Sequence, residues 1–250
     1  MRLSENVEIV DGTPIAYLRD LKALVCSDLH LGYEGVMAER RRYFLPKANL
    51  SSIKGYIGSA AAGRVVKELI VNGDIKNDFS KVHLEEFNEL KELVSFSEGL
   101  GIRRFLLVKG NHDNFIGRVG EGTGIVIYNG ELRRGEYVFA HGDKPVNLNG
   151  GKLLIIGHIH PSIALYTRLG AKERLRCFLY GKIRGGKMLV LPAASYFSEG
   201  FEISPGSESE LARMLGGDVD LGSIHALCIG EGETLDFGSL RDLLDASMEE

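Results

Sequence analysis

The chain has 250 residues, of which 44% are hydrophobic and 26% charged, an ordinary balance for a globular protein with a full core. No apolar run approaches the roughly 20 residues of a membrane span. The first residues lack the apolar centre of a signal peptide, so we expect a cytoplasmic protein with no membrane partner. A formal net charge of −4 argues against a protein that coats nucleic acid through bulk electrostatics.

The first half of the chain alternates predicted strands and helices. Helices are expected over 32–44, 50–64 and 82–100, and the last of these has apolar residues at three- and four-residue spacing. Apolar runs that end near residues 28, 74 and 110 are predicted to be buried strands between them. Alternation of this kind favours an α/β sheet that is covered by helices.

The second half is predicted to be rich in β-structure, because short apolar runs recur between glycine-rich turns. Strands are expected at 125–128, 137–140, 153–156, 163–167, 176–180 and 188–191. A linker-like stretch at 204–209 leads to a short helix, strands at 225–229 and 234–237, and a helix at 239–246. The part from 204 to 250 is too short for a core of its own. We therefore expect it to complete the second sheet and add a C-terminal helix, in one domain spanning 1–250.

Five of the apolar runs end in a short polar tip that carries potential metal ligands. The runs with their tips are 24–30, 69–75, 105–113, 137–143 and 153–160. A histidine taken alone is more often structural, and we interpret His83 and His225 in that way. Five strands that end alike are far more than chance placement of seven histidines gives, so the tips predict one shared site.

The residue types in the tips suit metal binding. Residues i and i+2 of a strand point to the same face, so Asp28 and His30 can reach one ion together, and His158 and His160 can share a pocket. Imidazole with carboxylate suits Mn, Fe, Zn or Ni, and tips without cysteine argue against a structural thiolate zinc site. Asp74 could hold two ions through its two oxygens, at the roughly 3.5–4 Å separation of two-metal phosphoryl-transfer sites. Such ions would attract an anionic substrate to an acidic protein.

As a set, these motifs resemble the signature of the calcineurin-like metallophosphoesterases over residues 23–195. The matching motifs are Asp28-x-His30, Gly73-Asp74, Gly110-Asn111-His112-Asp113, His141 and Gly157-His158-x-His160. The stretches 28–34 and 156–161 are most similar to the SbcD-related phosphoesterases of archaeal type. The resemblance implies a four-layer αββα sandwich with a dinuclear metal site between two mixed β-sheets.

The resemblance also implies a role for each residue of the motifs. One metal would be held by Asp28, His30 and His160, the second by Asn111, His141 and His158, and both by Asp74. His112 would be the catalytic histidine that stabilises the phosphate or protonates the leaving oxygen. Asp113 would orient His112, as carboxylates commonly do for functional imidazoles. The implied cofactors are two divalent metal ions, with Mn favoured and Fe, Zn or Ni as alternatives.

The function implied is that of a metal-dependent phosphoesterase in which a metal-bridging hydroxide attacks phosphorus. We prefer a phosphodiesterase, with a nucleotide or nucleic acid among the candidate substrates. The alternatives are a weakly active subunit of a DNA-repair assembly that binds nucleic acid or a partner, and a nuclease related to the SbcD group. Relatives that repair DNA have a second histidine three residues after the bridging aspartate, where this chain has Asn77. An amide cannot donate a proton in the same way, so we expect activity on small diesters and little on double-stranded DNA.

Overall fold

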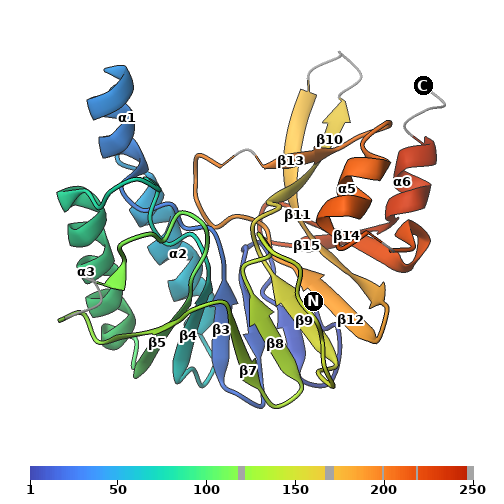
Figure 1. Cartoon of the computed structure of the whole chain (residues 1–250), viewed down its shortest axis with the longest axis horizontal. Coiled ribbons are helices and arrows are strands. Elements are labelled where there is room, and N and C mark those ends of the chain that lie inside the picture. The colour runs from blue at the N-terminus through green and yellow to red at the C-terminus, as the bar shows by residue number, and fades with distance from the viewer. Residues whose placement is uncertain (118–121, 167–171, 199, 218, 247–250) are drawn as a thin grey trace.

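The computed structural model describes residues 1–117, 122–166, 172–198, 200–217 and 219–246. Two mixed β-sheets pack face to face, and helices cover the outer face of each sheet (Figure 1). The predicted four-layer αββα sandwich is therefore confirmed. In the part of the chain that the structure describes, no helix combines the length and the apolar character that crossing a bilayer requires.

The first sheet places three of the polar tips at one edge. Its strands, in spatial order, are β1 (Val7–Ile9), β2 (Ala16–Leu18), β3 (Ala23–Cys26), β4 (Glu68–Asn72), β5 (Arg104–Val108) and β6 (Ile125–Tyr128). β3, β4, β5 and β6 are parallel, whereas β1 and β2 are antiparallel to their neighbours. Parallel strands need crossover connections, and the helices lie in them. The carboxyl ends of β3, β4 and β5, where the tips begin, therefore meet.

The helices of the first half agree with the sequence prediction to within a few residues. They are α1 (Tyr33–Arg41), α2 (Asn49–Ala61) and α3 (Leu84–Gly99). The first ends earlier than expected, because Arg42 adopts a left-handed conformation with a φ of 55° and Pro46 follows. The His83 side chain and Glu86 form a capping box at the start of α3, which agrees with a structural role for this histidine.

The second sheet holds the remaining tips. Its path is β13-β10-β11-β12-β9-β8-β7, and β14 pairs with both β11 and β15. The bounds are β7 (Glu131–Arg134), β8 (Tyr137–Ala140), β9 (Leu153–Ile156), β10 (Pro161–Tyr166), β11 (Lys172–Ile183), β12 (Gly186–Val190), β13 (Phe201–Ile203), β14 (Ile224–Ile229) and β15 (Thr234–Ser239). The short helices α5 (Glu208–Met214) and α6 (Leu240–Ala246) cover its outer face (Figure 1). Position 167, which was expected to end a strand, lies outside the described residues.

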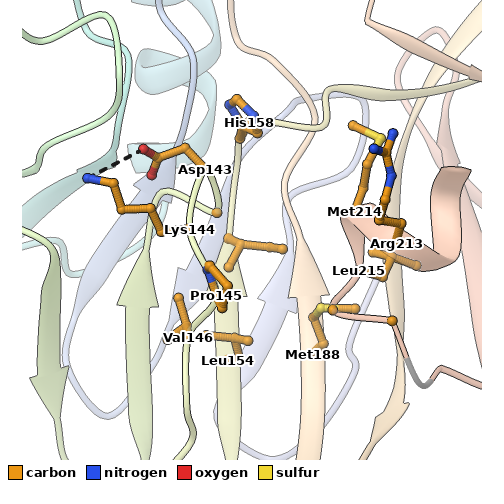
Figure 2. Close-up of a pocket in the computed structure, with 14 residues that line it drawn as sticks. Asp143, Lys144, Pro145, Val146, Leu154, His158, Met188, Arg213, Met214 and Leu215 are labelled. Carbon is orange, nitrogen blue, oxygen red and sulfur yellow. Dashed lines mark ion pairs between the residues drawn. The ribbon is translucent and has the colours of Figure 1, made fainter.

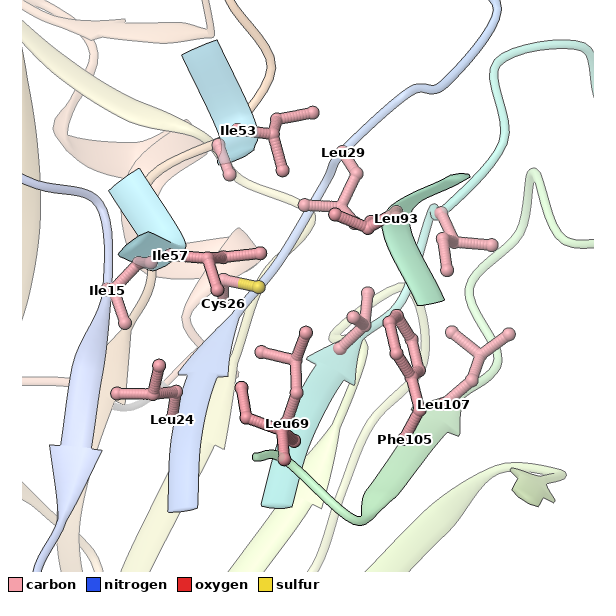
Figure 3. Close-up of a cluster of buried hydrophobic side chains, with 14 of the residues drawn as sticks. Ile15, Leu24, Cys26, Leu29, Ile53, Ile57, Leu69, Leu93, Phe105 and Leu107 are labelled. Atoms are coloured by element: carbon pink, nitrogen blue, oxygen red, sulfur yellow. The ribbon is translucent and has the colours of Figure 1, made fainter. Parts of the chain in front are cut away.

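Alternate residues of each central strand enter different hydrophobic layers. On β3, Leu24 and Cys26 pack with α2 and α3 in one cluster (Figure 3). Ala23 and Val25, on the opposite face of the same strand, face the second sheet and share a hydrophobic cluster with Phe139 of β8. Because both faces of these strands are buried, both alternating sets of side chains are apolar, and each strand is a continuous apolar run in the sequence.

Candidate metal centre

The polar tips of both sheets are joined by hydrogen bonds. The backbone N–H of Asp28 donates to the carbonyl of Gly73, and that of His30 donates to the carbonyl of Asp74, both at 3.0 Å. The second sheet joins them through His158, whose backbone N–H donates to Oδ2 of Asp28 at 3.1 Å. The tips therefore form one framework and are not independent loops.

Asp28, His30 and His160 form a first candidate metal-binding group, with ligand atoms that all lie within 4.8 Å of one another. Nε2 of His160 lies 2.9 Å from Oδ1 of Asp28. The hydroxyl of Ser198 lies 2.8 Å from the other ring nitrogen of His160 and fixes the ring. Nδ1 of His30 is buried and has no hydrogen-bond partner among the described residues. An unsatisfied buried polar atom costs about 1–3 kcal/mol, a cost that a bound cation would remove.

Asp74, His141 and His158 form a second candidate group. Nε2 of His141 lies 3.2 Å from Oδ2 of Asp74 and 3.2 Å from Nδ1 of His158. The same nitrogen lies 3.1 Å from Oδ1 of Asn111. A ring nitrogen carries at most one proton, so it can satisfy only one of these three neighbours. A divalent cation can accept lone pairs from all four atoms, so this donor set fits a metal.

The two groups are contiguous. Nδ1 of His141 lies 3.9 Å from Oδ1 of Asp28, which belongs to the first group. One oxygen of Asp74 faces His141, and the other accepts a hydrogen bond from the backbone N–H of His112 at 2.8 Å. Adjacent groups of carboxylates and imidazoles are the arrangement that two-metal sites require.

Backbone strain is concentrated at the candidate ligands. Among the described residues, nine that are not glycine have a positive φ. Five of these nine are Asp28, His30, Asp74, His158 and His160. Such conformations cost about 1–3 kcal/mol each and persist only where the surrounding structure enforces them, which is typical of functional sites.

Two glycines leave the space that the carboxylates of the site occupy. A Cβ atom at Gly110 would collide with both the carboxylate and the backbone nitrogen of Asp74. A Cβ atom at Gly157 would collide with the side chains of Ser27 and Asp28. The tips can approach this closely only because both positions lack a side chain.

The imidazole of His112 lies beside the first group. Its ring centroid is 5.1 Å from that of His30, and the ring of Phe79, which is 57% exposed, approaches it edge-on at 6.2 Å. Nδ1 of His112 lies 2.6 Å from the backbone carbonyl oxygen of Asn77. A carbonyl only accepts hydrogen bonds, so Nδ1 carries the proton. Nε2 is therefore the ring atom that can face a substrate, and it carries a proton only when the ring is cationic.

The orienting contact predicted between Asp113 and His112 is not the one that the structure shows. The Asp113 carboxylate is buried and accepts three backbone N–H groups, at 2.9, 2.9 and 3.4 Å. The donors are Ile75, Gly110 and Lys76. Asp113 therefore joins the loop after β4 to the loop after β5, and the Asn77 carbonyl holds the imidazole instead.

Neighbouring charges control protonation within the site. Burial alone would raise the pKa of Asp28, but His160, His141 and His30 outweigh it and hold that pKa well below its usual range. Burial alone would lower the pKa of His141, but Asp74 and Asp28 raise it to about 9. Burial lowers the pKa of His30 to about 4. Burial alone would also raise the pKa of Asp74, but His141 holds it below its usual value. Asp28 and Asp74 are thus ionised and ready to bind cations, and His141 must release a proton when a metal binds.

Sequence reasoning missed two supporting residues. Nδ2 of Asn72 donates to the carbonyls of Ala140 and Ile155, at 2.7 and 2.9 Å, and so ties the first sheet to two strands of the second beside the site. The sequence did mark Asn72 as unusual, because an amide side chain within an apolar run needs buried hydrogen-bond partners. Ser198, which binds His160, gave no such signal, because serine is common in loops.

A sandwich of this type with two adjacent candidate metal-binding groups is the arrangement expected of a metal-dependent phosphoesterase. Residues 21–161, more than half of the chain, match the family model of calcineurin-like phosphoesterases. The chain therefore belongs to the calcineurin-like phosphoesterase family, whose members use divalent metal ions. Among solved structures it is similar to nuclease MPE of Pseudomonas putida, with 18% identity and a TM-score of 0.62 over 90% of this chain and 93% of that one. That likeness shows the fold. No curated protein matches the sequence.

Proposed function

We propose that the chain is a phosphodiesterase of the SbcD-related archaeal type that uses two divalent ions, with Mn preferred. The ions would be held by Asp28, His30 and His160 on one side, by Asn111, His141 and His158 on the other, and by Asp74 between them. The observation that carries this proposal is the convergence of three lone-pair donors on Nε2 of His141, directly beside the first group.

When bound, the two cations would supply an activated water nucleophile and neutralise charge on the phosphate oxygens. The residues of the chain would then hold protons and transfer them at defined atoms. His112 is held through Nδ1 by the Asn77 carbonyl, so Nε2 of the cationic ring would donate its proton to the leaving oxygen. General acid assistance of this kind contributes typically about 10²–10⁴-fold to the rate.

Two features support a small or single-stranded diester as the substrate. The side chain at position 77 is an amide, so His112 has no second imidazole three residues after Asp74 to assist it. The chain is also acidic overall, so it lacks the general attraction to a duplex that a basic protein would have. The similar fold of a nuclease is compatible with a nucleic-acid diester as one such substrate.

The test is to deplete the protein of metal, reload it with Mn²⁺, Fe²⁺, Zn²⁺ or Ni²⁺, and assay two chromogenic esters. Bis(p-nitrophenyl) phosphate should be hydrolysed fastest with Mn²⁺, and p-nitrophenyl phosphate more slowly. Single-stranded and duplex oligonucleotides assayed in parallel should show little cleavage of the duplex. No hydrolysis with any of the four metals would refute the proposal. A preference for the monoester would make the protein a monoesterase, and efficient duplex degradation would move it toward DNA repair.

A further inference from the structure

A cavity of about 520 Å³ opens directly beside His158, in the second candidate metal group (Figure 2). This volume lies within the roughly 300–1,000 Å³ that is typical of small-molecule sites. None of the metal-centre roles described above uses the cavity beyond His158. Its chemistry can therefore indicate what else a substrate carries besides its phosphate.

The floor of the cavity and the metal group are built by the same strand. Leu154 and Ile156 on β9 line the cavity, and His158 follows at the next alternate position of the chain. Met188, from the neighbouring β12, completes the floor. Leu154 and Ile156 are 7% and 4% exposed and Met188 is only 1% exposed, so the floor is packed into the hydrophobic core of the second sheet. A group bound there would have a fixed position relative to the phosphate.

The walls combine apolar and charged groups. Met214 and Leu215, at the end of α5, face Val146 across the cavity (Figure 2). The exposed side chains of Arg213 and Lys144 stand at its rim. An apolar interior with a charged rim fits a planar heterocycle, because its faces are apolar and its edges form hydrogen bonds. Methionine thioethers also make favourable contacts with aromatic rings.

The position of His112 indicates which part of a diester would enter the cavity. His112 lies beside His30 of the first group, whereas the cavity opens beside His158 of the second. The leaving oxygen must lie within reach of His112 to receive its proton. The substituent beside His158 is then the one that stays on the phosphate.

We propose that this cavity binds the unpaired base of a nucleoside that remains attached to the phosphate during cleavage. The proposal rests on the phosphodiesterase function proposed above and names its substrate class, nucleotide diesters or single-stranded nucleic acid. A base within a duplex is stacked and paired, and extruding it costs a few kcal/mol. The cavity therefore favours substrates whose bases are already free.

The first test measures binding without catalysis. Protein labelled with ¹³C at the methionine methyl groups is freed of metal and titrated with adenosine and with thymidine, neither of which carries a phosphate. The methyl signals of Met188 and Met214 should shift in a saturable way. The signal of Met37, on α1 at the opposite side of the molecule, should not move (Figure 1). Unchanged Met188 and Met214 signals up to millimolar nucleoside would overturn the proposal.

The second test compares diesters that share a p-nitrophenyl leaving group and differ in the retained group, which is methyl, phenyl or thymidine-5′. The ratio of kcat/KM for the thymidine ester to that for the methyl ester should fall about tenfold in Met214→Ala, as expected when several methylene contacts are lost. Met37→Ala should keep the wild-type ratio. A preference for the phenyl ester equal to that for the thymidine ester would overturn the nucleoside assignment. If no diester is hydrolysed, the phosphodiesterase function fails, and the methionine signals still decide whether the cavity binds nucleosides.

Discussion

Replacing Asp113 should reveal whether this carboxylate acts through the backbone of the site. Its oxygens accept N–H groups from Ile75 and Gly110 at 2.9 Å and, at 3.4 Å, from Lys76. Asp113→Ala would leave the buried N–H groups of Ile75 and Lys76 and the half-buried N–H of Gly110 without an acceptor. Asp113→Asn keeps one carbonyl oxygen but places an NH₂ group, which cannot accept, opposite one of the loops.

The expected loss of stability follows from these contacts. A buried donor without a partner costs about 1–3 kcal/mol, so two strong contacts and one weak one give about 4 kcal/mol for Asp113→Ala. For a chain of this size that corresponds to a Tm lower by roughly 10 °C. Asp113→Asn should lose about half as much. Burial and the nearby Asp74 raise the pKa of Asp113 to about 6, so removing its charge also relieves repulsion.

Thermal unfolding followed by circular dichroism measures these differences, with the exposed Asp245→Ala on α6 as the control. Metal affinity should fall together with stability, by about 10–100-fold, because Asp113 fixes the loops that carry Asp74 and Asn111. A Tm for Asp113→Ala within 2 °C of wild type would refute this reasoning. Unchanged stability with a large loss of kcat would instead indicate that Asp113 orients His112 directly.

Two further predictions concern the same site, and a third concerns Asp78, in the segment between β4 and α3. His112→Ala should retain its metal and lose about 10²–10⁴-fold in kcat, because it removes the general acid. Kinetics and elemental analysis of the same sample test this, and loss of metal together with activity would show that His112 is a metal ligand. Gly110→Ala should fold by circular dichroism but bind little metal, because its Cβ would occupy the space of the Asp74 carboxylate; full metal content would contradict this. Burial alone would raise the pKa of Asp78, but hydrogen bonds from His83 and Ser80 hold it well below its usual range. Asp78 therefore stabilises the fold above about pH 4 and loses this effect in acid, so Asp78→Asn should flatten the acid limb of Tm against pH; an unchanged limb would count against it.

The central strands and the candidate site could be predicted from the sequence because both depend on local pattern. Buried parallel strands require continuous apolar runs, and their carboxyl ends must meet at one edge, so the tips at Asp28 and Asp74 were expected to lie together. The edge strands β7 and β13 were not predicted. β7 has a single buried residue, Leu132, and β13 has three residues in all, so neither gives a periodic signal.

The partner of His112 could not be predicted, because it is a backbone carbonyl 35 residues away in the chain. Every residue has a carbonyl, so no residue type marks position 77 for this role. The family resemblance implied Asp113 for this role, but the fold turns that side chain toward the backbone N–H groups of Ile75, Lys76 and Gly110. Contacts of this kind become visible only when the loops are placed in space.

The most direct test of the dinuclear centre is the metal content of Asp74→Ala, measured by elemental analysis after Mn²⁺ loading and gel filtration. Wild-type protein should hold about two ions per chain, as two-metal sites do. Asp74→Ala should lose both, because Asp74 is the ligand assigned to both ions, while Asp245→Ala should keep them. Two ions retained by Asp74→Ala, with activity intact, would contradict the assignment of the centre.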